Sequence, residues 1–142
     1  MKKIKICGLK RSEDVDYVNT YQPDYVGFVF AGKKRKITYD QAKELKKGLL
    51  SSIQVVGVFV NEDISFVEKL VKNDVIDLVQ LHGQETNEYI KILKQKIDEF
   101  AFEKEANELE YNYQKLQKEI VENIRLHTEA LCNFTDNFII DF

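Results

Sequence analysis

Four short apolar segments, each followed by a stretch with the spacing of an amphipathic helix, limit what this chain can fold into. Their apolar runs are nearly continuous, which is typical of strands covered on both faces of a parallel sheet. We expect strands over residues 3–7, 24–30, 53–60 and 77–81. Strands that alternate with helices favour an α/β fold with a parallel sheet and right-handed crossovers.

The stretches between these segments carry helix signals. Ser12 is a candidate N-cap of a first helix, and Thr38 is a candidate N-cap of a second. The third helix is predicted from one apolar stripe, which consists of Ile64, Val67, Leu70 and Val71. A fourth helix is expected over residues 85–97.

The regular alternation ends near residue 97. Residues 98–119 are dense in Glu, Lys, Asn and Gln, and apolar side chains recur there every three or four positions. This pattern predicts an inserted charged helix that is mostly solvent-exposed and has no part in chemistry. We expect the rest, residues 120–142, to carry a fifth strand over 121–126, a short helix over 128–133 and a sixth strand over 137–141. Residues 1–142 are treated as a single domain, with four regular βα units in 1–97.

The composition excludes several classes of protein. The 21 Lys and Arg residues nearly balance the 24 Asp and Glu residues, and the net charge of −3 argues against binding to nucleic acid. No apolar run approaches the roughly 18 residues of a membrane helix, and the N-terminal apolar stretch is too short for a signal peptide. We therefore expect no membrane contact and a cytoplasmic location.

Sequence motifs for common cofactors are absent. Cys7 and Cys132 lie far apart without metal-ligand spacing, so we predict neither a disulfide framework nor a metal site. No GxGxxG, GxxxxGK[ST], HExxH or CxxC pattern occurs, which argues against dinucleotide, P-loop and zinc chemistry.

Two candidate acid–base residues stand at predicted strand ends. Cys7 ends the first strand and Asp141 ends the last, so parallel strands would bring both to the same edge of the sheet. A thiolate can serve as a base or nucleophile near positive charge, and a buried carboxyl can serve as an acid. The alternatives are a buried apolar role for Cys7 and a solvated chain-end charge for Asp141.

Two further candidates are suited to anions. Arg35 lies in the basic run that follows the second strand, where its guanidinium could clamp a carboxylate or phosphate. His82 follows the fourth strand and could donate a hydrogen bond to an anionic substrate. A solvated basic loop and a polar strand-end histidine are the alternatives. Asn61, at the end of the third strand, would lie in the same mouth.

The order of these motifs carries a resemblance to a known family. The motifs are Lys5-Ile6-Cys7-Gly8-Leu9, Gly27-Phe28-Val29-Phe30, Lys34-Arg35-Lys36-Ile37, Gly57-Val58-Phe59-Val60-Asn61 and Val79-Gln80-Leu81-His82-Gly83-Gln84-Glu85. In this order the chain resembles the phosphoribosylanthranilate isomerases. Ile124-Arg125-Leu126 and Phe138-Ile139-Ile140-Asp141 are similar, more weakly, to the fifth and sixth strands of that family.

The resemblance implies an isomerase of tryptophan biosynthesis with a (βα)8 TIM-type barrel and no cofactor. Its substrate would be N-(5-phosphoribosyl)anthranilate, which an Amadori rearrangement converts to 1-(2-carboxyphenylamino)-1-deoxyribulose 5-phosphate. In such enzymes the aspartate matching Asp141 protonates the ribose ring oxygen, and the cysteine matching Cys7 removes the proton from C2. The arginine matching Arg35 would pair with the anthranilate carboxylate, and His82 would contact the substrate.

The family pattern continues beyond the motifs found here. A barrel of this kind has about 200 residues or more. From the 142 residues we therefore predict an incomplete barrel with about six parallel strands, and we expect its activity to be reduced. Its open sheet edges could pair with another copy. Three other hypotheses fit the sequence: a non-catalytic remnant, an interaction module, and a different barrel enzyme acting on a small phosphorylated substrate.

Overall fold

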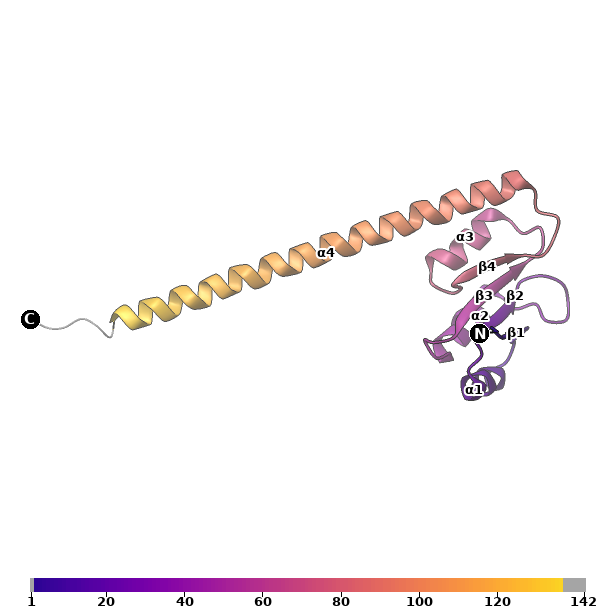
Figure 1. The fold of residues 1–142 in the computed structure, drawn as a ribbon, viewed down its shortest axis with the longest axis horizontal. Coiled ribbons are helices and arrows are strands. Elements are labelled where there is room, and N and C mark those ends of the chain that lie inside the picture. Colours follow the sequence, from indigo (N-terminus) through magenta and orange to yellow (C-terminus); the bar gives the residue numbers. More distant parts are fainter. Residues whose placement is uncertain (1, 137–142) are drawn as a thin grey trace, which may run out of the picture. The chain divides into compact units, whose positions relative to one another are not determined.

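The structure, a computed structural model, describes residues 2–136 of the chain, and the side chains as far as residue 126. Four strands alternate with four helices (Figure 1). The elements are β1 (Lys5–Cys7), α1 (Ser12–Tyr21), β2 (Tyr25–Val29), α2 (Tyr39–Gly48), β3 (Gln54–Phe59), α3 (Ile64–Lys72), β4 (Leu78–Leu81) and α4 (Asn87–Asp136). The four predicted strands are confirmed, and the first and last residue of each lie within two positions of those expected.

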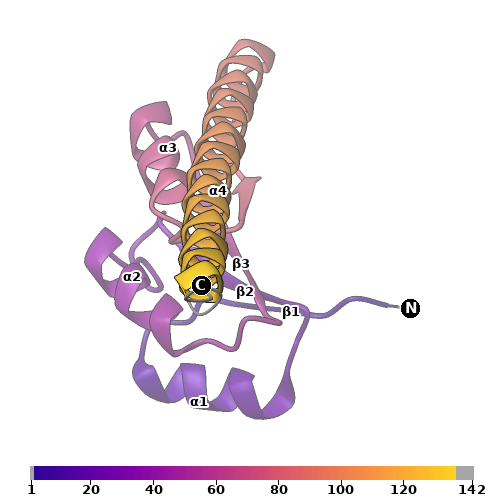
Figure 2. The same cartoon turned by 90° about the vertical axis from the view of Figure 1, so that its left-hand side faces the viewer.

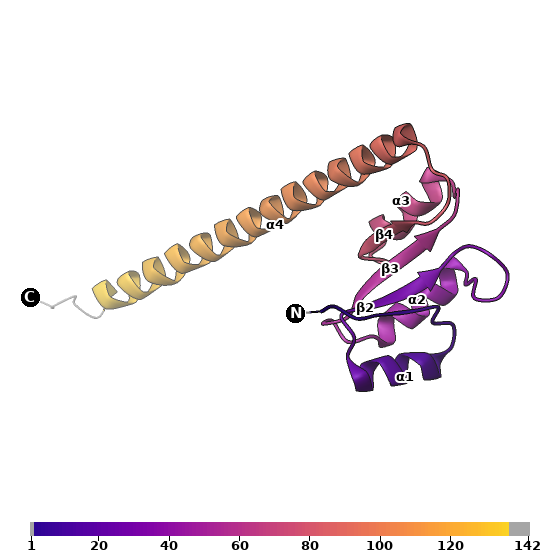
Figure 3. The ribbon, with the colours of Figure 1, turned by 45° about the vertical axis from the view of Figure 1, so that its right-hand side comes forward.

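The strands form one parallel sheet, as the sequence predicts, and their order is β1-β2-β3-β4. Figure 3 shows β2, β3 and β4 following one another across the sheet. The register places Cys7 beside Gly27, Gly27 beside Val56 and Val56 beside Leu78. Within the described residues the sheet is not closed, since β1 pairs only with β2 and β4 pairs only with β3.

Helices α1, α2 and α3 lie on one face of this sheet (Figure 2). Side chains alternate along a strand, so every second residue of β2 and β3 points toward these helices. Val26, Phe28, Val55 and Phe59 are fully buried there. The Phe30 ring stacks on Phe59 with centroids 5.1 Å apart, and the edge of Phe66 meets it at 5.7 Å. The core therefore lies between the sheet and these helices, and none of α1, α2 and α3 covers the opposite face of the sheet.

Local capping sets where the helices begin. The Thr38 hydroxyl accepts the Gln41 N–H at 3.2 Å and the Gln41 side chain accepts the Thr38 N–H at 2.9 Å, a capping box that confirms the predicted N-cap. Ser12, in contrast, is the first residue of α1 and not its N-cap, which is Arg11. The Asp14 carboxylate accepts the Lys10 and Arg11 N–H groups at 2.9 and 3.0 Å, so it supplies the cap from inside the first turn.

Helix α4 differs most from the sequence prediction. We expected a fourth helix to end near 97, an inserted helix over 98–119 and a fifth strand over 121–126, whereas the structure has one continuous helix, Asn87–Asp136. The fifth-strand prediction is wrong because Leu116, Ile120 and Ile124 continue the four-residue spacing of a helix and not the alternation of a strand. The predicted short helix over 128–133 falls inside α4. The sixth strand, over 137–141, lies outside the described residues.

The chain divides into two units, Met1–Glu99 and Phe100–Phe142. The first contains the sheet, helices α1 to α3 and the first turns of α4, where Leu93 is buried in the core. The second continues α4 as far as Asp136. The single-domain assignment over residues 1–142 stays a prediction. Over the residues that the structure describes, no helix is long and apolar enough to cross a membrane.

Candidate active site

A hollow of about 580 Å³ opens on the face of the sheet opposite α1, α2 and α3, toward the carboxyl ends of its strands. It is lined from all four strands and from the loop that follows β2. The lining residues are Lys5, Cys7, Val29, Ala31, Gly32, Lys33, Lys34, Arg35, Val58, Gln80 and His82. Three of the predicted site residues, Cys7, Arg35 and His82, therefore come together although they lie far apart in sequence.

Cys7 ends β1 with an exposed thiol. Its register partner on β2 is Gly27, where an added Cβ would come within 2.4 Å of the Cys7 sulfur. Only a residue without a side chain leaves this room, because real Cβ atoms essentially never approach another atom so closely. Gly27 thus allows the thiol to lie over the neighbouring strand, inside the hollow.

Arg35 is held against the end of β1. Its Nη1 donates to the Cys7 carbonyl oxygen at 3.3 Å, and its Cδ lies 2.5 Å from where a Cβ of Gly8 would stand. Gly8 has a φ of 96°, which a side-chain-bearing residue rarely adopts. The guanidinium is exposed and keeps further donors for an anion.

Lys5 and Gln80 were not among the predicted site residues, yet their side chains meet in this hollow. The Lys5 Nζ donates to the Gln80 Oε1, which joins strands from the two edges of the sheet. The signal for Lys5 was present in the sequence, because residues two apart on a strand share a face and Cys7 is two positions away. With Lys33, Lys34 and Arg35 on the loop, the hollow is rich in cations and suited to an anionic ligand.

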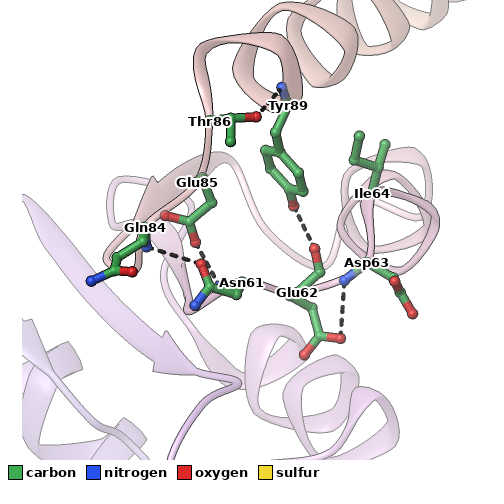
Figure 4. A pocket seen from close by; sticks show the side chains of 8 residues that line it. All are labelled: Asn61, Glu62, Asp63, Ile64, Gln84, Glu85, Thr86 and Tyr89. Carbon is green, nitrogen blue, oxygen red and sulfur yellow. Dashed lines mark hydrogen bonds between the residues drawn. The ribbon is translucent and has the colours of Figure 1, made fainter.

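Asn61 does not line this hollow. It belongs to a neighbouring cleft of about 520 Å³ between the loops after β3 and β4, so our prediction that it shares one mouth with Cys7 is wrong. Figure 4 shows this cleft with Asn61 and Glu85 turned toward one another and the Tyr89 hydroxyl turned toward Glu62. Its lining residues are Asn61, Glu62, Asp63, Ile64, Gln84, Glu85, Thr86 and Tyr89.

Asp141, the predicted general acid, lies outside the described residues. Among the residues that are described, no group of three or more His, Cys, Asp or Glu side chains is placed to hold a metal ion. The described part of the site therefore consists of a thiol, an imidazole and several cations.

Comparison with known proteins extends this description. The family model for N-(5'-phosphoribosyl)anthranilate (PRA) isomerase matches residues 4–123. A curated protein of that name from Endomicrobium trichonymphae is 56% identical over 97 residues, which are 68% of this chain and 48% of that protein.

Two solved structures are similar in fold. One is a phosphoribosyl anthranilate isomerase in complex with reduced 1-(o-carboxyphenylamino)-1-deoxyribulose 5-phosphate (rCdRP). It is 34% identical with a TM-score of 0.63, over 68% of this chain and 50% of that one. The other, from Thermotoga maritima, is 36% identical with a TM-score of 0.60, over 70% of this chain and 47% of that one. The chain spans about half the length of the curated relatives it matches.

Proposed function

Because the chain belongs to the N-(5'-phosphoribosyl)anthranilate isomerase family, we propose that it takes part in tryptophan biosynthesis as that isomerase. The reaction is the Amadori rearrangement of N-(5-phosphoribosyl)anthranilate to 1-(2-carboxyphenylamino)-1-deoxyribulose 5-phosphate. The observation that carries the proposal is the hollow in which Cys7, Arg35 and His82 come together at the carboxyl ends of parallel strands. A relative's structure with bound rCdRP supports the substrate class.

The proposed chemistry needs one acid and one base. The acid, Asp141, gives its proton to the ribose ring oxygen while the C1–O bond breaks, and the substrate nitrogen forms a Schiff base with C1. The base, the Cys7 thiolate, then takes the proton from C2, and the electron pair moves into a C1–C2 double bond. The resulting enol becomes the ketone when its hydroxyl loses a proton and C1 gains one. No external oxidant or reductant enters, since C1 is reduced as C2 is oxidised.

The substrate carries two anionic groups, a carboxylate and a phosphate. We assign the anthranilate carboxylate to Arg35, whose planar guanidinium matches a carboxylate in two parallel hydrogen bonds. We assign a second substrate contact to His82, which also lines the hollow. The Lys5–Gln80 pair forms part of the hollow's lining and adds one more positive charge to it.

An assay with substrate generated in situ tests this function. The fluorescence of the anthranilate-bearing substrate is followed after the chain is added at increasing concentration. We expect turnover that is lost, by about a hundredfold or more, in Cys7→Ala and in Asp141→Asn. Cys132→Ala is the matched control for a cysteine substitution, since the chain has two cysteines. No turnover at any concentration would favour the non-catalytic remnant.

The open sheet edges favour a second role that is compatible with the first. We propose that the four described strands are the first four of a (βα)8 barrel, and that their edges pair with another copy when nothing else covers them. Both edge strands point the same way, so β4 of one copy can continue the sheet with β1 of another. The expected species in sedimentation velocity is a dimer or larger, and a monomer at all concentrations contradicts the pairing.

We place the protein in the cytoplasm, which cell fractionation tests.

A further inference from the structure

Two loops that follow neighbouring strands are clasped by a reciprocal set of hydrogen bonds (Figure 4). The Glu85 Oε1 accepts the Asn61 N–H at 2.7 Å, and the Glu85 Oε2 accepts the Gly83 N–H at 3.0 Å. In return, the Asn61 Oδ1 accepts the Gln84 N–H at 2.9 Å. One carboxylate and one amide therefore tie the β3–α3 loop to the β4–α4 loop.

The backbone at both ends of this clasp is shaped for it. Asn61 has a φ of 49°, a left-handed conformation in which asparagine is among the few tolerated side chains. A Cβ at Gly83 would come within 2.8 Å of the Asn61 Oδ1 and within 2.9 Å of the Asn61 backbone nitrogen. Any larger residue at position 83 would therefore push the two loops apart.

The hydrogen bonds of the clasp favour the ionised form of Glu85. The Asn61 N–H, and to a smaller extent the Gly83 N–H and the nearby His82, lower the pKa of this carboxyl below its ordinary value. The other titratable groups of the cleft are Glu62 and Asp63, from the loop after β3, and Tyr89 of α4. The Tyr89 hydroxyl donates to the Glu62 carbonyl at 2.7 Å and so adds a second tie between the same two segments.

The clasp bears directly on His82, which lies one residue before Gly83. The His82 N–H donates to the Phe59 carbonyl at 2.8 Å, as a continuation of the β3–β4 pairing. The peptide on one side of His82 is thus bound to β3, and the next N–H is bound to Glu85. We propose that Glu85, together with Asn61, is a positioning residue that holds the His82 imidazole at the rim of the anion-binding hollow.

This inference rests on the proposed function for its consequence, because His82 matters as a substrate contact only if that substrate binds. Glu85 itself lines the neighbouring cleft and not the hollow, so it acts on a ligand only through His82. Loss of the clasp should weaken rCdRP binding by about tenfold, a typical size for coupling between residues in one hydrogen-bond network.

A spectroscopic measurement tests the position of His82 without any ligand. The chain has two histidines, so imidazole spectra of histidine-labelled protein contain His82 and one internal reference, His127. In Glu85→Gln, an NH2 group replaces one of the two carboxylate oxygens, so one of the two backbone N–H groups loses its acceptor. We expect the His82 resonances to shift and those of His127 to stay unchanged. Glu88→Gln, which removes the same charge three residues further along at an exposed position, should shift neither.

A double-mutant cycle on rCdRP affinity, measured by calorimetry on variants that are folded by their amide spectra, tests the coupling. Glu85→Gln and His82→Ala should each weaken binding, and the double variant should bind no more weakly than His82→Ala alone. The inference would be overturned if the two substitutions weakened binding independently, so that their fold-changes multiplied in the double variant. An unchanged affinity in Glu85→Gln would also overturn it. If the wild-type chain binds no rCdRP, the proposed function fails, and the imidazole spectrum alone decides the positioning role: an unmoved His82 refutes it.

Discussion

Residues 1–99 and the described part of α4 beyond residue 100 use apolar side chains in opposite ways. In the first region nineteen hydrophobic residues are buried, and Phe28, Phe30 and Phe59 are at most 1% exposed. In the second, every residue from 101 to 126 is exposed, including Phe102 at 74% and Leu109 at 71%. Both regions show apolar residues at regular spacing, so the spacing alone does not determine which of them form a core.

The difference shows what a helical pattern does and does not provide. Residues at intervals of three and four place apolar side chains on one side of a helix, but burial requires a second surface. Helices α1 to α3 have that surface in the sheet. Leu93, in the first turns of α4, is buried against the same core, whereas Leu116 and Ile120 remain about half exposed. The stability of the chain should therefore come from the first region.

The largest effect that tests this comparison is expected from a core truncation. Phe59→Ala removes a fully buried ring that stacks on Phe30, and it should lower the free energy of unfolding by about 3–5 kcal/mol. Leu109→Ala on the exposed helix should change it by less than about 0.5 kcal/mol. Urea unfolding, followed by the amide signals of β3, measures both. A large loss in Leu109→Ala would mean that a partner or a second copy covers this part of α4.

A smaller loss of stability is expected when a buried backbone N–H loses its hydrogen-bond acceptor. The Asp77 carboxylate accepts the Val55 N–H at 2.7 Å and pairs with Lys46 at 2.5 Å. Asp77→Ala leaves the N–H of a fully buried residue without this partner, which should cost about 1–3 kcal/mol. Glu110→Ala, in which the carboxylate lost is exposed and accepts from the Gln114 side chain, is the control from the second region. Equal losses in the two variants would contradict the contrast between the regions.

The smallest effect is a dependence of stability on pH. A hydrogen bond from Arg11, with further ones from the Lys10 and Arg11 N–H groups, lowers the pKa of Asp14 from 3.8 to about 2. A carboxyl whose pKa is lower in the folded state than in the unfolded state stabilises the fold at any pH above its ordinary pKa. This contribution disappears as the pH falls from about 4 to about 2. At neutral pH we expect Asp14→Asn to be less stable by about 1 kcal/mol, since solvent screens this surface pair.

Unfolding of wild-type and Asp14→Asn protein at several pH values measures this dependence. The two stability curves should converge toward pH 2, where the wild-type carboxyl is protonated as well. Glu122→Gln provides the comparison from the second region. A hydrogen bond from Arg125 lowers the pKa of Glu122 too, but both side chains of that pair are more than half exposed, and we expect the variant to follow the wild-type curve. A gap that widens on acidification would refute the role of Asp14.

Prediction of the fold from sequence succeeded where the signals were local. The apolar runs around Val26 and Val55 and the N-cap at Thr38 involve residues close in sequence, and they predicted two strands and the start of α2. The fifth-strand prediction failed because it depended on a segment of six residues that begins with the β-branched Val121, whereas the helical spacing from Leu109 to Ile124 extends over a longer stretch. The longer periodicity is the better guide when the two disagree.

Three residues that were expected at strand ends or just after them line one hollow, and their roles in a site stay predictions. Cys7 ends β1 and His82 follows β4, and parallel pairing alone brings such positions to one edge of a sheet. The Lys5–Gln80 bond and the Glu85–Asn61 clasp were not predicted, because each joins elements whose spacing depends on the register. Asn61 was assigned to the wrong cavity for the same reason.

The order of apolar and polar residues was enough to establish the strands, the helices between them and the edge at which the reactive side chains gather. These features follow from backbone geometry and from interactions within a few residues. Which helix has a surface to pack against, which carboxylate ties two loops together and which cavity Asn61 enters depend on contacts between residues 20 or more positions apart. Such contacts form only once the whole sheet is assembled, and only the three-dimensional structure shows them.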